Sequence, residues 1–340
     1  MEINSSNVNQ SGIDQHDLSG SYVAISVLCF LMAAVIISLN GLVIFILARQ
    51  KGNNRLHFFI FHLAIADLCV GLVSVLGEGV FSGILRGEWF MGDVMCRTWR
   101  YSTVVVLIVS NNLLIGMSVD RYLAVRYPLR AITGEYRPYK AIIICSWVMA
   151  LLIPVWTFPY TGAVLYETTY YCGVTITTDL GWKLYVGFTL LLVFFIPFLA
   201  VSVCYICITV VVWEHWRKSR NLTEMNYILE DSTCKPCHET NNSGLLPKAR
   251  IKTIKMTLII CFAFLICWLP ATVFHILDVY QISVLDVRYY IVLQRLYPLN
   301  SACNPVIFLI FSRNILPCGS TKSSDTTRGY ESVDTTNTTT

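Results

Sequence analysis

Long runs of apolar residues without a single charge dominate this chain. Six runs contain no Asp, Glu, Lys or Arg: 18–48, 101–119, 141–166, 184–213, 256–277 and 296–312. A seventh run, 56–81, is interrupted by Asp67 and Glu78. Each run is near or above the roughly 20 residues that a helix needs to cross about 30 Å of hydrocarbon. Lipid tolerates charges in a span only where they face protein or water. The pattern therefore predicts seven transmembrane helices, with Asp67 and Glu78 directed into the bundle.

Composition agrees with a membrane protein. Of the 340 residues 55% are hydrophobic and 14% are charged, against about a quarter charged in soluble domains. We expect the fold class to be an all-α membrane protein, a seven-transmembrane helix bundle in a lipid bilayer. It should span 22–312, with a third inner loop over about 214–250, between an amino tail, 1–21, and a carboxyl tail, 313–340. The net charge is only +4 and the basic residues sit in short loops, so nucleic acid is not an expected partner.

The basic residues predict the orientation. If the amino end is outside, nineteen of the 25 Lys and Arg fall on the cytoplasmic side, which is where basic loops are retained. The amino tail also carries glycosylation sequons at Asn4 and Asn9, although a sequon alone is weak evidence. The first helix is expected to serve as the targeting signal. The carboxyl tail should therefore be cytoplasmic.

Two of the 13 cysteines, Cys96 and Cys172, fall in predicted outer segments. Most of the others lie within apolar helices, where a free cysteine behaves as a small hydrophobe. A cysteine pair outside the cell is normally oxidised. We therefore predict a disulfide that joins the head of the third helix to the second outer loop.

Polar and proline motifs recur deep in three of the predicted helices. The third helix ends in Asp120-Arg121-Tyr122, the sixth contains Cys267-Trp268-Leu269-Pro270, and the seventh contains Asn304-Pro305. A proline removes a backbone hydrogen bond and kinks a helix. Taken in order over about 22–318, these motifs resemble those of the rhodopsin-like class of G-protein-coupled receptors.

The resemblance implies a multi-pass plasma-membrane receptor and a mechanism. An outer ligand would favour a state in which the inner end of the sixth helix moves outward and a heterotrimeric G protein binds beside Arg121. Leu129 would be a second G-protein contact. The implied activation switch comprises Asp120, Arg121, Tyr122, Tyr205, Phe264, Trp268, Pro270, Asn304, Pro305 and Phe308.

Two positions depart from the pattern of the class. Phe308 stands where these receptors often have tyrosine, and Arg250 stands where some have an acid near the inner end of the sixth helix. An ion pair between Arg121 and that position cannot form, so packing and other contacts must hold the resting state.

The carboxyl tail has features of a regulatory segment. Residues 320–340 include 12 Ser or Thr. Their phosphorylation by receptor kinases would create an acidic cluster for arrestin, while a merely disordered polar tail is the alternative. Cys318 is an expected palmitoylation site.

A polar group in the middle of the bundle resembles the internal sodium site of the class. Its members are Asp67, Ser110, Asn300, Ser301 and Asn304. A buried carboxylate needs compensation, and oxygen ligands suit a hard cation. A water-bridged network or a protonated Asp67 is the alternative. Beyond an allosteric sodium ion, no cofactor is expected.

Single residues argue against two ligand classes and against catalysis. An amine receptor of this class would have an aspartate where this chain has Thr103, and a retinal protein would need a lysine in the seventh helix, which has none. No nucleophile, base and orienting group gather in one segment, so an enzyme is not expected.

Longer stretches narrow the resemblance to peptide receptors. They are similar to neuropeptide S receptors and arthropod receptors for crustacean cardioactive peptide, within the vasopressin and oxytocin group; the stretches are GDVMCRTWRY, PKARIKTIKMTLII, HILDVY and PLNSACNPVIF. An extracellular neuropeptide is thus the expected ligand. An orphan or non-peptide receptor of the class is one alternative. A seven-helix transporter is another, but it would be expected to show an internal repeat, and none is visible.

The expected ligand pocket lies toward the outer ends of the helices. Its members are Glu78, Arg100, Thr103, Thr157, His275, Gln294 and Arg295. Glu78 follows Asp67 by 11 residues, which is about three helical turns or roughly 16 Å, so it should share the inward face of Asp67. Glu78 could meet a basic group of the peptide, or Glu78 and Arg100 could neutralise each other without touching the ligand.

Overall fold

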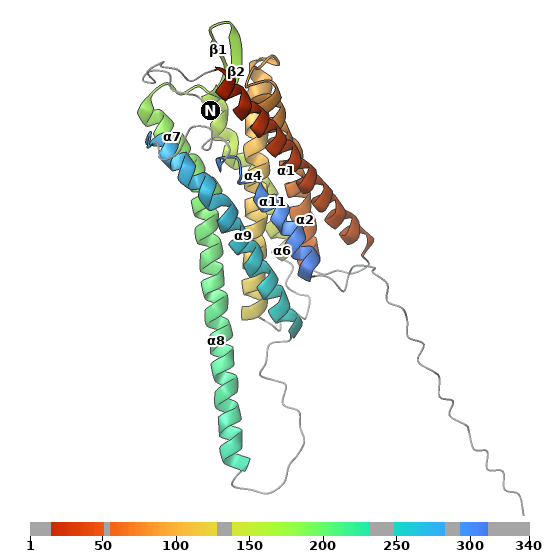
Figure 1. Cartoon of the computed structure of the whole chain (residues 1–340). Helices are drawn as coiled ribbons and strands as arrows, with labels where there is room; N and C mark the ends of the chain where they lie inside the picture. Colours follow the sequence, from red (N-terminus) through yellow and green to blue (C-terminus); the bar gives the residue numbers. More distant parts are fainter. Residues whose placement is uncertain (1–14, 51–54, 128–137, 231–247, 283–292, 312–340) are drawn as a thin grey trace, which may run out of the picture.

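The chain folds into a bundle of seven helices, as the apolar runs predict (Figure 1). The computed structural model describes residues 15–50, 55–127, 138–230, 248–282 and 293–311. Among these residues, six helices are long and apolar enough to cross a bilayer, and Leu299–Phe311 is a shorter apolar helix. The predicted fold class is therefore confirmed.

The first three helices of the bundle follow the first three apolar runs. Helix 1 is α1 (Gln15–Arg49) and helix 3 is α4 (Gly92–Arg126). Helix 2 is irregular and consists of α2 (Arg55–Cys69), π-helical η1 (Val70–Val75), α3 (Leu76–Glu78) and π-helical η2 (Gly79–Ile84).

The other four helices also match their apolar runs. Helix 6 is α9 (Lys248–Val279) and helix 7 is α11 (Leu299–Phe311). Helix 4 combines α6 (Pro138–Leu152) with the 3-10 segment η3 (Ile153–Tyr160). Helix 5 consists of α7 (Asp179–Leu190), π-helical η4 (Leu191–Phe195) and α8 (Ile196–Glu230), which runs on beyond the other helices (Figure 1).

A β-hairpin covers one end of the bundle. Strands β1 (Thr161–Tyr166) and β2 (Thr169–Val174) pair antiparallel, and the disulfide Cys96–Cys172 joins β2 to the first turns of α4, which confirms the predicted bond. Asp93 of α4 also accepts a hydrogen bond from the Ala163 amide of β1 at 2.9 Å. The hairpin is thus tied to helix 3 through both of its strands. We call this end of the bundle the hairpin end, and the opposite end the Arg121 end.

Apolar side chains fill the centre of the bundle and also cover its outside. Fully buried examples are Phe59, Leu113 and Phe264, which belong to helices 2, 3 and 6. Other large apolar side chains, such as Ile206 and Phe262, are about 60% exposed. A soluble protein seldom exposes so many apolar groups together, whereas a lipid bilayer provides the apolar surroundings that they require.

Candidate functional site

Asp67 lies fully buried among helices 2, 3 and 7. Its Oδ1 atom accepts hydrogen bonds from Ser110 at 2.7 Å and Ser301 at 2.8 Å, and its Oδ2 atom accepts one from Asn304 at 2.8 Å. A buried carboxylate is tolerated when donors compensate its charge. One side chain therefore ties three helices together. We call Asp67, Ser110, Ser301 and Asn304 the Asp67 cluster.

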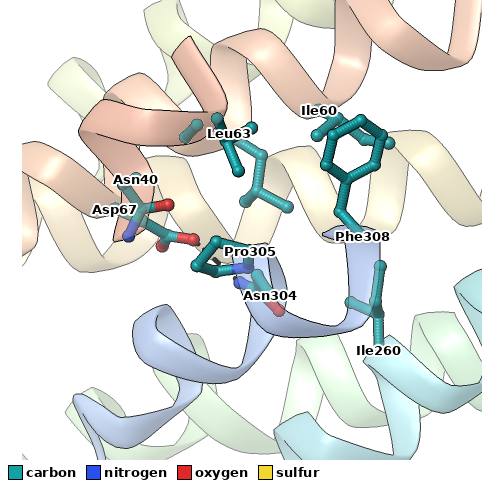
Figure 2. A pocket seen from close by; sticks show the side chains of 10 residues that line it. Asn40, Ile60, Leu63, Asp67, Ile260, Asn304, Pro305 and Phe308 are labelled. Carbon is teal, nitrogen blue, oxygen red and sulfur yellow. Dashed lines mark hydrogen bonds between the residues drawn. The ribbon is translucent and has the colours of Figure 1, made fainter. Parts of the chain in front are cut away.

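A small cavity borders the Asp67 cluster, between helices 1, 2, 6 and 7. Figure 2 shows Asn40, Asp67 and Asn304 toward one side of it, and Ile60 and Phe308 toward the other. Its volume is about 10 Å³, which is close to the space that one water molecule requires. The whole cavity is thus about the size of a single water molecule.

Three asparagines of helices 1 and 7, one of them in the cluster, have side-chain oxygens of the kind that bind a cation. Asn40 donates through Nδ2 to the carbonyls of Ile36 at 2.9 Å and Ser301 at 3.0 Å. The Oδ1 atoms of Asn40, Asn300 and Asn304 are buried and accept no hydrogen bond from the described residues. Such oxygens, together with a carboxylate, are ligands that suit a hard cation.

Aromatic rings connect the middle of helix 6 to helices 5 and 7. Trp268 stacks on Tyr297, with ring centres 5.0 Å apart, and Phe264 lies 6.0 Å from Trp268 and 6.1 Å from Phe194. Pro270 lies within α9, two residues beyond Trp268. Movement of helix 6 must therefore repack rings of helix 5 and of the turn that precedes α11.

The Arg121 end contains a buried cluster of charges. The guanidinium group of Arg121 contacts the carboxylate of Asp120, and Arg55 Nη1 of helix 2 lies 3.8 Å from Asp120 Oδ1. Asp120 is therefore shared by two arginines. The sequence interpretation overlooked Arg55, which begins α2 and carries no motif that would mark it. Leu129 lies outside the described residues, as does the side chain of Arg250.

Toward the hairpin end, Glu78 pairs with Arg295. Nη2 and Nε of Arg295 lie 2.7 Å and 2.9 Å from Glu78 Oε1, and the two side chains are 14% and 25% exposed for Arg295 and Glu78. The neutralising partner considered from the sequence was Arg100. The direct contact comes instead from Arg295, in the turn before α11, while Arg100 of helix 3 is within electrostatic reach of Glu78.

Arg100 has a different set of contacts. One guanidinium nitrogen, Nη2, donates to the Cys172 carbonyl of β2 at 3.2 Å, and the group lies 5.4 Å from the centre of the Trp99 ring. Its Nε atom is buried and has no hydrogen-bond partner among the described residues. Arg100 therefore connects helix 3 to the hairpin, and no carboxylate in the described part of the chain contacts it directly.

Comparison with known proteins decides the family. A profile of the 7 transmembrane receptor (rhodopsin family) matches residues 39–308. This chain belongs to the rhodopsin family of receptors. It is therefore a multi-pass, G-protein-coupled receptor and not an enzyme, as the motifs predicted.

Several receptors of known name are similar to this one. The neuropeptide S receptors of Macaca mulatta and Homo sapiens are 35% and 34% identical to it over 291 residues, which cover 84% of this receptor and 76% of theirs. The mesotocin receptor of Rhinella marina is 29% identical over 92% of this receptor and 82% of its own length. The expected similarity to neuropeptide S receptors and to the oxytocin group is thus confirmed.

The remaining residues of the predicted pocket differ in their burial and in their hydrogen-bond partners. Thr157 is buried and donates to its own helix, at Pro154, and Gln294 donates to the Phe274 carbonyl at 3.4 Å. The hydroxyl of Thr103 is buried without a partner among the described residues, and His275 is partly buried on α9. Thr103 is therefore more available to a ligand than Thr157 is.

Asn111 of helix 3 is a structural contact that the sequence interpretation missed. Its Nδ2 atom donates to the Val193 carbonyl in η4 at 2.8 Å, in the receptor core. Pro197 follows Val193 by four residues and has no backbone N–H, so it leaves that carbonyl without its usual helical donor. The signal was available, since a proline in a helix predicts an unpaired carbonyl one turn earlier.

Proposed function

We propose that this receptor binds an extracellular peptide and, when the peptide is bound, activates a heterotrimeric G protein. Similar receptors are named for neuropeptide S and mesotocin, which favours a peptide over other ligands. The observation that carries the proposal is the group of charged residues, Glu78, Arg100 and Arg295, beside the disulfide-anchored hairpin. Charged and polar groups of this kind match the amines, carboxylates and amides of a peptide.

We also propose that the hairpin end faces the outside of the cell. Nineteen of the 25 Lys and Arg would then lie on the cytoplasmic side, in agreement with the retention of basic loops there. The disulfide between Cys96 and Cys172 would lie in an oxidising compartment, where such bonds persist. The glycosylation sites proposed at Asn4 and Asn9 would lie outside too, although both fall outside the described residues.

A peptide bound at the hairpin end could influence helix 6 through a short series of contacts. Arg295 lies two residues before Tyr297, which stacks on Trp268, and the Trp268 ring lies near Phe264. A peptide that binds one arrangement of Arg295 more tightly would shift the population toward that arrangement. We propose that ligand contact with Glu78, Arg100, Thr103, Thr157, His275, Gln294 or Arg295 biases the rings in this way.

At the Arg121 end, the proposed response is an exchange of partners. Arg121 contacts Asp120, which also lies near Arg55. Outward movement of helix 6 would open a space in which Arg121 leaves Asp120 and contacts the G protein. Leu129 would enter an apolar pocket of the G protein. Tyr122, Tyr205, Asn304, Pro305 and Phe308 complete the switch in this proposal.

The Asp67 cluster is the proposed sodium site. Its carboxylate, together with the Oδ1 atoms of Asn300 and Asn304, supplies oxygen ligands beside a cavity of about 10 Å³. A bound sodium ion would supply a positive charge to Asp67. The ligand set favours the arrangement of helices 2, 3 and 7 seen here, and an arrangement that separates them would bind the ion less tightly.

We propose that receptor kinases and arrestin end the signal through the carboxyl tail. The 12 Ser or Thr of residues 320–340 would each gain nearly two negative charges on phosphorylation. Truncation after Cys318 should therefore slow desensitisation without reducing the first response, measured as repeated calcium responses in cells. Unchanged desensitisation would exclude this role. Cys318, the proposed palmitoylation site, and the tail lie outside the described residues.

A peptide screen in cells tests the proposed ligand class. Cells that express the receptor are exposed to a library of synthetic neuropeptides while calcium and cyclic AMP are recorded. Activation by a peptide, and its loss in cells that express Arg121→Ala at equal surface level, is the expected result. A transporter would give neither response. Activation by a non-peptide metabolite, with none from any peptide, would favour a non-peptide receptor instead.

A further inference from the structure

Arg100 is a partly buried charge at the hairpin end for which the described residues provide no ion-pair partner. Glu78 lies within electrostatic reach of Arg100, but its direct contacts are with Arg295. On the same helix Asp93 is paired with Arg97, one turn before Arg100. No described carboxylate forms an ion pair with the Arg100 guanidinium. Glu78, Arg295 and Arg100 together therefore carry one excess positive charge.

Unused hydrogen-bond donors occur on Arg100 itself, one turn further along helix 3 at Thr103, and on Trp156 of helix 4. The Nε atom of Arg100, the hydroxyl of Thr103 and the indole nitrogen of Trp156 are all buried without a partner among the described residues. Trp156 lies 5.0 Å from the ring centre of Tyr185, which in turn is within electrostatic reach of Arg100. Arginine and indole nitrogens can only donate. The complement of this site is therefore a group that accepts hydrogen bonds and carries negative charge.

We propose that Arg100 is the anchor for a carboxylate of the ligand, with Thr103 and Trp156 as accessory donors. A carboxylate offers two oxygens in one plane, which matches the forked donors of a guanidinium group. In a peptide it would be an Asp or Glu side chain or a free carboxyl terminus. This inference rests on the proposed peptide function and specifies which charge of the peptide the receptor recognises.

The proposal reverses the charge first expected of the ligand. The sequence placed an acid, Glu78, where a basic group of the peptide could bind. Because Arg295 already occupies Glu78 with two nitrogen contacts, a basic group would have to displace it. A carboxylate at Arg100 needs no such displacement, since among the described residues only the Cys172 carbonyl accepts from that guanidinium.

A first test requires no ligand. Purified, ligand-free receptor is compared with its Arg100→Gln and Arg295→Gln variants by thermal unfolding. An unpaired charge destabilises the folded state, so removing it should not lower stability. Loss of one partner from an ion pair leaves the other charge unpaired, so that change should lower stability. Arg100→Gln should therefore melt at the wild-type temperature or above it, and Arg295→Gln should melt below it. If Arg100→Gln lowered the melting temperature as much as Arg295→Gln, the receptor itself would already supply an ion-pair partner for Arg100. That result would overturn the proposal.

A second test uses matched synthetic peptides. Each activating peptide from the screen is made in matched pairs. In one pair the acidic side chain is kept or replaced by its amide, and in the other the carboxyl terminus is a free acid or an amide. At the wild-type receptor one acidic form should be about ten- to a hundredfold more potent than its neutral partner, as expected for a charge-assisted hydrogen bond. At Arg100→Gln that ratio should fall close to one. Equal ratios at both receptors would overturn the proposal.

A control variant on the same helix separates this effect from a general loss of folding. Arg97 is paired with Asp93 and contacts the Phe158 carbonyl, so Arg97→Gln should retain the wild-type ratio between acidic and neutral peptides. If no peptide activates the wild-type receptor, the proposed peptide function fails. The melting comparison still decides whether Arg100 is unpaired, so the two failures can be told apart.

Discussion

Asp67 and Arg100 are oppositely charged residues of the same bundle, and they differ in how many hydrogen-bond partners compensate their charge. Asp67 is fully buried and accepts three hydrogen bonds of 2.7 to 2.8 Å from helices 3 and 7. Arg100 donates to a single carbonyl at 3.2 Å and has a buried nitrogen without a partner among the described residues. The first charge is compensated within the bundle, where it links helices. We propose that the second charge is compensated by a carboxylate of the ligand.

Removing the Asp67 carboxylate should have the largest effect on stability. Asp67→Ala would leave Ser110, Ser301 and Asn304 without their shared acceptor in a buried site, at about 1–3 kcal/mol for each stranded group. We expect a much lower melting temperature and little receptor at the cell surface. Wild-type melting behaviour in this variant would contradict the idea that the cluster holds three helices together.

A milder change at the same residue tests the sodium proposal. Asp67→Asn keeps one acceptor oxygen but removes the charge that favours a cation. The wild-type receptor should melt at a higher temperature in sodium chloride than in potassium chloride, and the variant should show no difference between the salts. If the wild type is also insensitive to the choice of salt, water rather than sodium fills the site, while the hydrogen-bond argument stands.

Breaking the pair of Glu78 and Arg295 should have an intermediate effect. Glu78→Gln leaves Arg295 without its carboxylate, and we expect a loss of about 1.5–3 kcal/mol, the range for hydrogen bonds to charged groups. The potency of all peptides should fall alike. The double variant Glu78→Gln/Arg295→Gln should be more stable than either single variant, since neither member of this pair is then left without its partner. If Glu78→Gln weakened only peptides with a basic group, Glu78 would be a ligand contact.

The smallest effect on stability is expected at Asn111, whose uncharged amide donates to the uncharged Val193 carbonyl. Asn111→Leu would remove the side-chain donor to the Val193 carbonyl, whose α-helical donor position is occupied by Pro197, and should cost about 1 kcal/mol. Asn112→Leu is a matched control, as the carbonyl that Asn112 contacts belongs to Ser146 within the regular part of α6. Thermal unfolding of both variants decides the point, and equal losses would contradict the assigned role of Asn111.

The fold and the Asp67 cluster could be predicted from the sequence because lipid imposes strict rules. Spans must be long and free of charge, and a charge such as Asp67 must turn inward. Ser110, Ser301 and Asn304 were predicted as its partners and contact it directly. Asn300 was also predicted, but no described contact joins its side chain to Asp67.

The partner of Glu78 could not be predicted in the same way. The count of three turns from Asp67 to Glu78 assumed a regular α-helix, whereas the π-helical segment η1 lies between them. A π-helical insertion rotates the residues that follow it, so the direction of Glu78 depends on a local irregularity. Arg100 and Arg295 were both within reach by residue count. Only the packing of helix 2 against the turn before α11 selects Arg295.

Nucleotide exchange on a purified G protein tests the central claim most directly. The receptor is reconstituted in lipid discs with a heterotrimer, and GTP uptake is followed with and without an activating peptide. We predict that the peptide accelerates exchange with wild-type receptor, and that Arg121→Ala binds the same peptide but gives no acceleration, because the residue that would contact the G protein is absent. Full acceleration by Arg121→Ala, or none by the wild type with any bound peptide, would contradict the account.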